Sequence, residues 1–279
     1  GEKFPWKLLY RNKIGVWQFL PLAPTDSRGS PYNSPSSFAL NPWLLDSKEL
    51  VEKGFINQSI INELPGADKS NKNDGIVDFD LAELRSTYLG GALRKEWGLQ
   101  GVEAHKVFNN WCKKQFWLDD HAAFMELRRQ HMGLPWWRWE EDLALHKKTK
   151  LQEWKRANND SLLEHRLLQW HLDRQWQDVR LLAKSLGIAL FGDLPFYVAR
   201  DSADVWSNRS LFSVSSKGDL YLQSGVPPDY FSSTGQLWGT PVYRWVLHNL
   251  SRFNWWRRRF SRQWQLVDLL RLDHFRALE

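Results

Sequence analysis

The clearest hydrophobic pattern in the chain is a helical stripe that ends at Gly187. Apolar residues return every three or four positions, at Leu172, Trp176, Val179, Ala183 and Leu186. This spacing predicts a long amphipathic helix. Asp160 or Ser161 is the expected N-cap, and Glu164 completes a capping box in the second case. Gly187 stands where helices commonly end in a left-handed residue.

An apolar strand is predicted directly after this helix. The run from Ile188 to Leu194 contains one acid, Asp193, and Pro195 closes it. A helix, a glycine turn and an apolar strand that ends in an acid form one unit of a parallel α/β fold.

A second unit of the same kind closes the chain. Residues 244–265 predict a helix with mixed basic and aromatic side chains, and residues 266–270 predict a buried parallel strand. Arg271 and Asp273 follow and, being two apart on an extended chain, point to the same side. In a β/α barrel the carboxyl ends of the strands share one face, so Asp193 and Asp273 are expected at one site.

The N-terminal part of the chain has shorter patterns. Residues 1–13 predict the end of a helix, residues 16–22 a strand and residues 44–64 short helices. The loop at 24–35 is rich in turn residues and carries Tyr32. Functional loops follow strand ends in α/β proteins, although a plain surface loop with a buried tyrosine is the alternative.

Helical spacing dominates from Asp78 to about Arg156, after a polar, glycine-bearing linker at 65–75. Residues 134–139 interrupt it with a proline and three tryptophans. Aromatic residues at helical spacing usually face a core, so we interpret these tryptophans as core rather than as a binding surface.

The stretch 197–241 lacks a regular pattern. Loops of this length inside a compact domain are usually functional or disordered. Disorder is disfavoured by its aromatic residues, which include Trp206, Tyr230, Phe231 and Trp238.

Composition narrows the classes of protein. The chain is 42% apolar and 25% charged, with a net charge of +6, as is ordinary for a globular protein. No run of eighteen apolar residues occurs, so a membrane partner is not expected. Cys112 is the only cysteine, which favours a reducing, cytoplasmic location. The histidines show no ligand spacing, so no metal is expected. A first residue other than Met and an abrupt end predict a fragment of a longer protein.

Arg271 and Asp273 carry the candidate chemistry. A guanidinium beside a carboxylate at a strand end keeps the acid ionised and therefore nucleophilic. A structural ion pair that closes the strand explains the same two residues equally well. The local pattern leaves both interpretations open.

Longer motifs identify a family. The chain resembles the bacterial amylomaltases, or 4-α-glucanotransferases, of glycoside hydrolase family 77. The motifs that carry the resemblance lie in family order: residues 17–22 with 30–32, 192–195 with 201–206, 225–232 with 235–239, and 271–276.

The resemblance implies a fold: an α/β protein that forms part of a (β/α)8 TIM-type barrel with a helical inserted subdomain. We therefore expect residues 1–77 to form the N-terminal part of the barrel. Residues 78–160 are then the helical insertion. Residues 161–279 form the central barrel segment, which ends just after the strand of the nucleophile.

The resemblance also implies an activity. The family are hexosyltransferases that move α-1,4-glucan segments from a donor to an acceptor sugar, with retention and without a cofactor. Asp273 matches the nucleophile, Asp193 a supporting acid, and Arg271 the residue that positions the nucleophile. The implied substrate-binding residues for malto-oligosaccharides are Tyr32, Asp229, Tyr230, Trp238 and His274. The family's acid/base lies outside this sequence, which implies that the chain alone is inactive.

Three other functions remain open. An α-amylase-like hydrolase differs from a transferase in its acceptor preference, which sequence motifs alone do not settle. A chain without its acid/base is also compatible with a non-catalytic carbohydrate-binding remnant. Trp255 to Arg259 mixes basic and aromatic residues, as single-strand nucleic-acid sites do. We interpret that segment instead as an amphipathic helix with a solvated basic face, so no nucleic-acid partner is expected.

Overall fold

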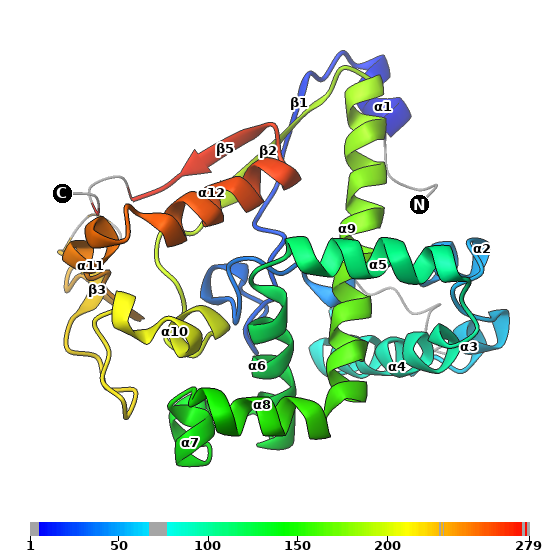
Figure 1. Ribbon diagram of the computed structural model, residues 1–279. Helices are drawn as coiled ribbons and strands as arrows, with labels where there is room; N and C mark the ends of the chain where they lie inside the picture. The colour runs from blue at the N-terminus through cyan, green and yellow to red at the C-terminus, as the bar shows by residue number, and fades with distance from the viewer. Residues whose placement is uncertain (1–5, 67–76, 229, 231, 275–276, 278–279) are drawn as a thin grey trace.

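A three-stranded parallel sheet organises the structure, a computed structural model that describes residues 6–66, 77–228, 230, 232–274 and 277. The strands are β1 (Val16–Gln18), β2 (Ala189–Leu194) and β5 (Leu269–Leu272), adjacent in that order. They lie side by side in the upper part of the molecule in Figure 1, and most of the helices lie below them. The predicted parallel α/β fold is confirmed.

The register between β2 and β5 sets the geometry of the strand ends. Asp193 pairs with Arg271, and Leu194 pairs with Leu272. Asp268 locks this register, because its Oδ2 accepts the backbone N–H of Leu190 at 3.0 Å. The carboxylate of Asp193 and the guanidinium of Arg271 therefore start from neighbouring backbone positions.

Twelve α-helices are described, nine before β2 in the chain and three after it. Those before β2 are α1 (Trp6–Arg11), α2 (Ser47–Glu52), α3 (Gln58–Asn62), α4 (Phe79–Trp97), α5 (Val102–Lys114), α6 (Leu118–Gln130), α7 (Glu141–Ala144), α8 (Lys148–Ala157) and α9 (Asn159–Ser185). Those after β2 are α10 (Ala203–Ser207), α11 (Trp245–Leu250) and α12 (Asn254–Leu266). None of the helices in the described part of the chain is long and apolar enough to cross a membrane.

The long helix α9 connects the sheet to the other helices. Its C-terminal part packs against β2, and its N-terminal part packs against α4 and α6 (Figure 1). Its predicted N-cap is wrong: the helix begins at Asn159, and Asn158 makes no side-chain capping bond. Glu164 instead accepts a hydrogen bond from Arg94 Nε at 2.8 Å, so the interaction between two helices replaces the capping box. The three-part division of the chain stays a proposal.

The C-terminal end of α9 is as predicted. Gly187 adopts a left-handed φ of 71°, and the N–H of Ile188 returns to the carbonyl of Ala183 at 2.9 Å. This turn aims the chain directly into β2.

Replacement of Gly187 tests this turn. A left-handed alanine is strained, so we expect Gly187→Ala to lower the free energy of unfolding by about 1 kcal/mol. Gly91→Ala is the matched control, because Gly91 lies inside α4 with free space where the methyl group would go. That change should raise stability by about 0.5–1 kcal/mol. Urea denaturation measures the change in the free energy of unfolding for both variants. A change of the same sign in the two variants would contradict the assignment of the turn.

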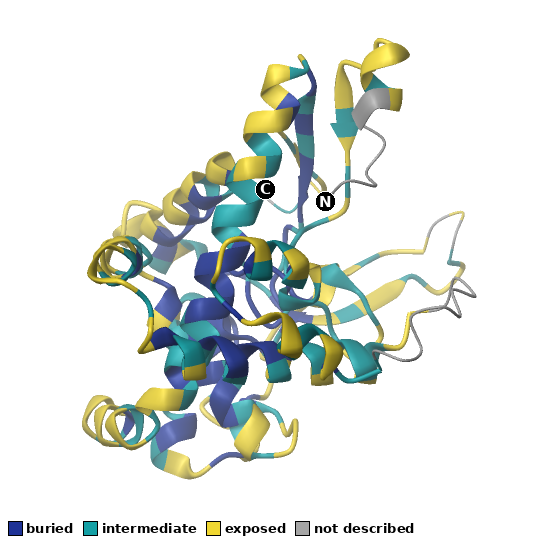
Figure 2. Cartoon of the chain, turned by 90° about the vertical axis from the view of Figure 1, so that its right-hand side faces the viewer, coloured by how far each residue is buried: buried dark blue, intermediate teal, exposed yellow. Residues whose placement is uncertain are grey.

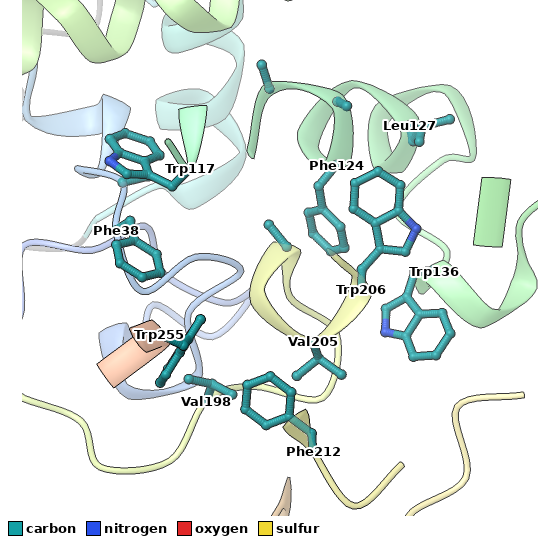
Figure 3. Close-up of a cluster of buried hydrophobic side chains, with 14 of the residues drawn as sticks. Phe38, Trp117, Phe124, Leu127, Trp136, Val198, Val205, Trp206, Phe212 and Trp255 are labelled. Carbon is teal, nitrogen blue, oxygen red and sulfur yellow. The ribbon is translucent and has the colours of Figure 1, made fainter. Parts of the chain in front are cut away.

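Buried aromatic residues form much of the core. Figure 2 shows the buried residues gathered in the interior, with exposed residues on the outward turns of the helices. One cluster contains Phe124, Trp136, Trp206 and Phe212, all essentially inaccessible to solvent (Figure 3). The tryptophans of the helical region are mostly core, as predicted: Trp97, Trp117, Trp136 and Trp139 are buried.

The helix and strand boundaries between residues 244 and 272 differ from the prediction. The apolar run at 266–270 divides, because Leu266 ends α12 and the strand begins only at Leu269. The predicted single helix at 244–265 is two helices. Arg252 and Phe253 both have left-handed φ angles, of 52° and 54°, and such residues cannot continue a right-handed helix.

Two further predictions change. The strand expected at 16–22 stops at Gln18. The stretch 197–241 is not irregular throughout, since it contains α10 and the antiparallel hairpin of β3 (Gln223–Val226) and β4 (Gln236–Pro241). The linker predicted at 65–75 lies largely outside the described residues.

Candidate active site

The carboxyl ends of β2 and β5 bring two acids to one arginine. Asp193 is only 5% exposed, and its Oδ2 accepts a hydrogen bond from the Tyr32 hydroxyl at 2.8 Å. Arg271 Nη1 lies 3.7 Å from the same oxygen. Arg271 Nη2 also donates to Asp273 Oδ2. Four of the residues predicted for the site therefore form one continuous polar cluster.

Asp273 stands at the exposed end of this cluster, directly after β5. Its Oδ1 accepts the backbone N–H of His274 at 2.9 Å. This hydrogen bond, aided by the charge of Arg271, lowers the pKa of Asp273 below its usual value. His274 itself has a left-handed φ of 56°. The carboxylate is thus held ionised and about half exposed, as a nucleophile requires.

Tyr32 lies in a loop that is held by hydrogen bonds between its own side chains and its backbone. Asp26 Oδ1 accepts the N–H groups of Arg28 and Ser30, each at 2.9 Å. Ser30 then caps the short 3-10 turn η1 (Pro31–Asn33). Partial burial, together with the hydrogen bond to Asp193, raises the pKa of Tyr32 to about 12. Tyr32 consequently remains a hydrogen-bond donor at neutral pH.

A hollow of about 420 Å³ opens beside these groups. Its lining includes Tyr32, Tyr197, Trp238, Asp273 and His274. The Trp238 indole from β4 meets the His274 ring edge to face, with centroids 4.5 Å apart. A hollow with aromatic walls and a few convergent polar groups is the usual form of a small-ligand site.

Two predicted site residues are not placed in this hollow. Asp229 lies outside the described residues. Tyr230 is 99% exposed and does not line the hollow. Their roles remain predictions from the family resemblance.

Residues behind the hollow were missed by the sequence analysis. Arg259 is 1% exposed, and its guanidinium donates to the carbonyls of Pro195 and Phe196. The Tyr243 hydroxyl donates to the Phe196 carbonyl at 2.6 Å. The Tyr197 ring stacks on the Tyr243 ring. Together they fix the wall of the hollow from inside the protein.

The prediction of a solvated basic face on α12 is therefore only partly correct. Arg257 and Arg258 are exposed, whereas Arg259 and Arg262 are buried. A spacing of four from Trp255 to Arg259 places the arginine on the apolar face, and this is the signal that could have revealed it.

The contributions of His274 and Arg271 to the lowered pKa of Asp273 can be separated. We expect Arg271→Met to raise that pKa only part of the way to its ordinary value, because the hydrogen bond from His274 N–H, the larger cause, remains. The lowered pKa stabilises the folded state above the ordinary pKa of an aspartate, and this contribution is lost as the pH falls through the lowered value. Titration of the carboxyl carbon by NMR measures the shift.

The exposed Arg257 supplies the control for this titration. Arg257→Met should leave the Asp273 titration almost unchanged, since this exposed arginine is not among the groups that shift that pKa. An Asp273 pKa that returns fully to its ordinary value in Arg271→Met would show that the His274 hydrogen bond is not made in solution.

A metal is not indicated by the donor set. Within the ranges that the structure describes, no three histidine, cysteine, aspartate or glutamate side chains gather closely enough to hold an ion.

Comparison with known proteins gives a consistent family. The family model described as 4-alpha-glucanotransferase, glycoside hydrolase family 77, matches residues 6–279. The 4-alpha-glucanotransferase of Synechocystis sp. is 40% identical over 95% of this chain and 52% of its own length. That of Thermus thermophilus is 38% identical over 94% of this chain and 51% of its own. The chain thus spans about half the length of these relatives.

The solved structures agree on the fold. An amylomaltase from Streptococcus agalactiae, in complex with acarbose, superposes with a TM-score of 0.87 and 28% identity. The match covers 98% of this chain and 54% of that chain. Nearly the whole chain therefore superposes on about half of an amylomaltase, and the predicted partial barrel is confirmed.

Proposed function

Because this chain belongs to the 4-alpha-glucanotransferase family, glycoside hydrolase family 77, we propose that it serves in the transfer of α-1,4-glucan segments between sugars. The reaction proceeds with retention at the anomeric carbon. One observation supports this function most strongly: Arg271 contacts both Asp193 and Asp273 at neighbouring strand ends.

Each residue of the cluster has a role in this proposal. Asp273 attacks the anomeric carbon and forms the glycosyl-enzyme intermediate. Arg271 keeps Asp273 ionised and oriented. Asp193 Oδ1 is buried and has no hydrogen-bond partner among the described residues, so it has an acceptor position open for a sugar hydroxyl.

The hollow supplies the rest of the sugar contacts. Tyr32, Trp238 and His274 border the ring of a malto-oligosaccharide, and apolar ring faces suit sugar faces. Asp229 and Tyr230 belong to the acceptor side in this proposal, on the family resemblance alone. Residues outside this chain supply the acid/base that a retaining mechanism also needs.

A second candidate is simple binding of carbohydrate. The hollow and its aromatic walls are sufficient for it, and it needs no acid/base. The structural relative from Streptococcus agalactiae was solved with acarbose, which makes acarbose the natural probe for this chain.

Maltotriose disproportionation tests these alternatives. In the first sample, the isolated chain is incubated with maltotriose. In the second, the chain is first co-produced with the part of the Synechocystis relative that has no counterpart in this chain, and the mixture is then incubated with maltotriose. Glucose together with longer oligomers indicates a transferase. Glucose and maltose without longer products indicate a hydrolase. No products in either sample, with acarbose still bound in a calorimetric titration, indicate the binding function.

We also propose a reducing compartment such as the cytoplasm. Cys112 is the only cysteine, and burial raises the pKa of its thiol to about 11, which leaves it unreactive. Fractionation of the source cells tests this location.

A further inference from the structure

Tyr197 lies in the wall of the hollow beside Asp273 and is half-buried. Its hydroxyl oxygen makes no hydrogen bond to any other residue that the structure describes. The oxygen is nevertheless accessible from outside the protein. A ligand in the hollow can therefore bond to this hydroxyl without breaking a hydrogen bond inside the protein, so the full contribution of the new bond goes to binding.

The two tyrosines nearest to this wall differ from Tyr197 in their hydrogen bonds. The Tyr32 hydroxyl donates to Asp193 Oδ2 at 2.8 Å. The Tyr243 hydroxyl donates to the Phe196 carbonyl at 2.6 Å. A phenol has a single proton to donate, so both of these groups are already used as donors inside the protein. Of the three phenols, Tyr197 is the one whose proton is available to a ligand.

The Trp238 indole lies beside the Tyr197 ring and also lines the hollow. The two ring centroids are 6.1 Å apart, and the ring planes are inclined by 57°. The indole N–H of Trp238 donates to Gln236 Oε1 at 3.1 Å, so Trp238 offers a ligand its apolar ring surface. Apolar ring surface next to one free hydroxyl suits a sugar ring, which has C–H faces and a rim of hydroxyl groups.

The Tyr197 ring is held in position from inside the protein. It stacks on the Tyr243 ring, with centroids 5.9 Å apart and planes within 13° of each other. The Phe196 ring meets it edge to face, with centroids 5.0 Å apart. The carbonyl of Phe196 accepts a hydrogen bond from Arg259 Nη1 at 2.9 Å, which fixes the backbone just before Tyr197. A side chain held in this way loses little conformational freedom when a ligand binds.

We propose that Tyr197 is a specificity-determining residue of this site, and that its hydroxyl donates a hydrogen bond to one hydroxyl oxygen of the glucan bound in the hollow. The inference rests on the proposed function, because the ligand is the α-1,4-glucan of that reaction. Burial raises the pKa of the Tyr197 phenol, so the group keeps its proton at neutral pH. A sugar that lacks the partner oxygen leaves this donor unpaired and binds less tightly.

Tyr197→Phe tests this role, because it removes the hydroxyl and keeps the ring that stacks on Tyr243. Acarbose affinity, measured by calorimetric titration of the chain, should fall about threefold to tenfold, the effect of one neutral hydrogen bond. The urea midpoint should stay the same, since the hydroxyl has no partner to lose among the described residues. Tyr221→Phe is the matched control, because Tyr221 is 71% exposed and does not line the hollow. It should bind acarbose as the unchanged chain does.

Maltose derivatives that each lack one hydroxyl group distinguish a direct contact from an indirect effect. In the unchanged chain, removal of the partner hydroxyl should weaken binding about as much as Tyr197→Phe does. In Tyr197→Phe the same removal should have no further effect, because the hydrogen bond is already lost. Losses that add for every derivative, or an acarbose affinity that Tyr197→Phe leaves intact, overturn the inference while the proposed function stands. If the unchanged chain binds neither acarbose nor maltose, the proposed function is overturned together with the inference.

Discussion

Asp273→Asn is expected to abolish glucan transfer and to leave acarbose binding almost unchanged. The amide has the shape of the carboxylate but cannot form the glycosyl-enzyme intermediate. Loss of a nucleophile lowers the turnover rate by a factor on the order of 10⁴ or more. Because Asp273 contacts Arg271 and His274 at an exposed strand end, the change should disturb the fold little. Initial rates of glucose release from maltotriose, in the preparation that shows transfer, measure the loss.

Azide distinguishes a nucleophile from a structural ion pair. In Asp273→Ala the small azide ion can enter the space left by the carboxylate and attack the anomeric carbon directly. The expected product is a β-glucosyl azide, of inverted configuration. Asp178→Asn, an exposed acid on α9, is the control and should keep the full rate. Full activity of Asp273→Asn, or no azide product from Asp273→Ala, would return Asp273 to the role of an ion pair that closes the strand.

The sequence predicted the elements better than their boundaries. The helix α9 is visible in the sequence because one face of it is buried, which gives a periodic pattern. The strand after Gly187 is visible because none of its residues is exposed, which gives a continuous apolar run. The run at 266–270 was misplaced because Leu266 and Val267 are buried at a helix end rather than in a strand. Short apolar runs fit both structures, and only tertiary packing decides between them. The hairpin of β3 and β4 was missed because its strands are short and largely exposed.

The candidate site was predicted where residues lie at strand ends. A parallel register places Asp193 opposite Arg271, so a spacing of two brings Asp273 into the same cluster. The hydrogen bond from Tyr32 to Asp193 joins residues 161 positions apart, and no local pattern contains it. The family resemblance assigned both residues to one site, but it did not predict this hydrogen bond. Arg259 was missed for a related reason: its partners are backbone carbonyls, which have no signature in a sequence.

Arg259→Met is expected to cost about 3–5 kcal/mol of the free energy of unfolding. The buried guanidinium donates to the carbonyls of Pro195 and Phe196 and contacts the Tyr243 hydroxyl at 3.2 Å. Each hydrogen bond from a charged donor contributes about 1.5–3 kcal/mol, and methionine leaves those carbonyl oxygens buried without a charged donor. Arg259→Lys can restore one of these bonds and should lose about half as much. Urea denaturation of each variant measures the cost.

Arg259→Met should also weaken ligand binding at the active site, because Arg259 supports one wall of the hollow there. Pro195, Phe196 and Tyr197 follow β2 and line the hollow beside Asp273. When the bonds from Arg259 to this segment are lost, acarbose affinity should fall about tenfold under conditions where the protein remains folded. Arg257→Met, on the exposed face of the same helix, should change stability by less than about 0.5 kcal/mol and leave binding intact. If Arg259→Met unfolds at the same urea concentration as the unchanged chain, the guanidinium does not hold the wall, and Tyr243 alone must fix the carbonyl of Phe196.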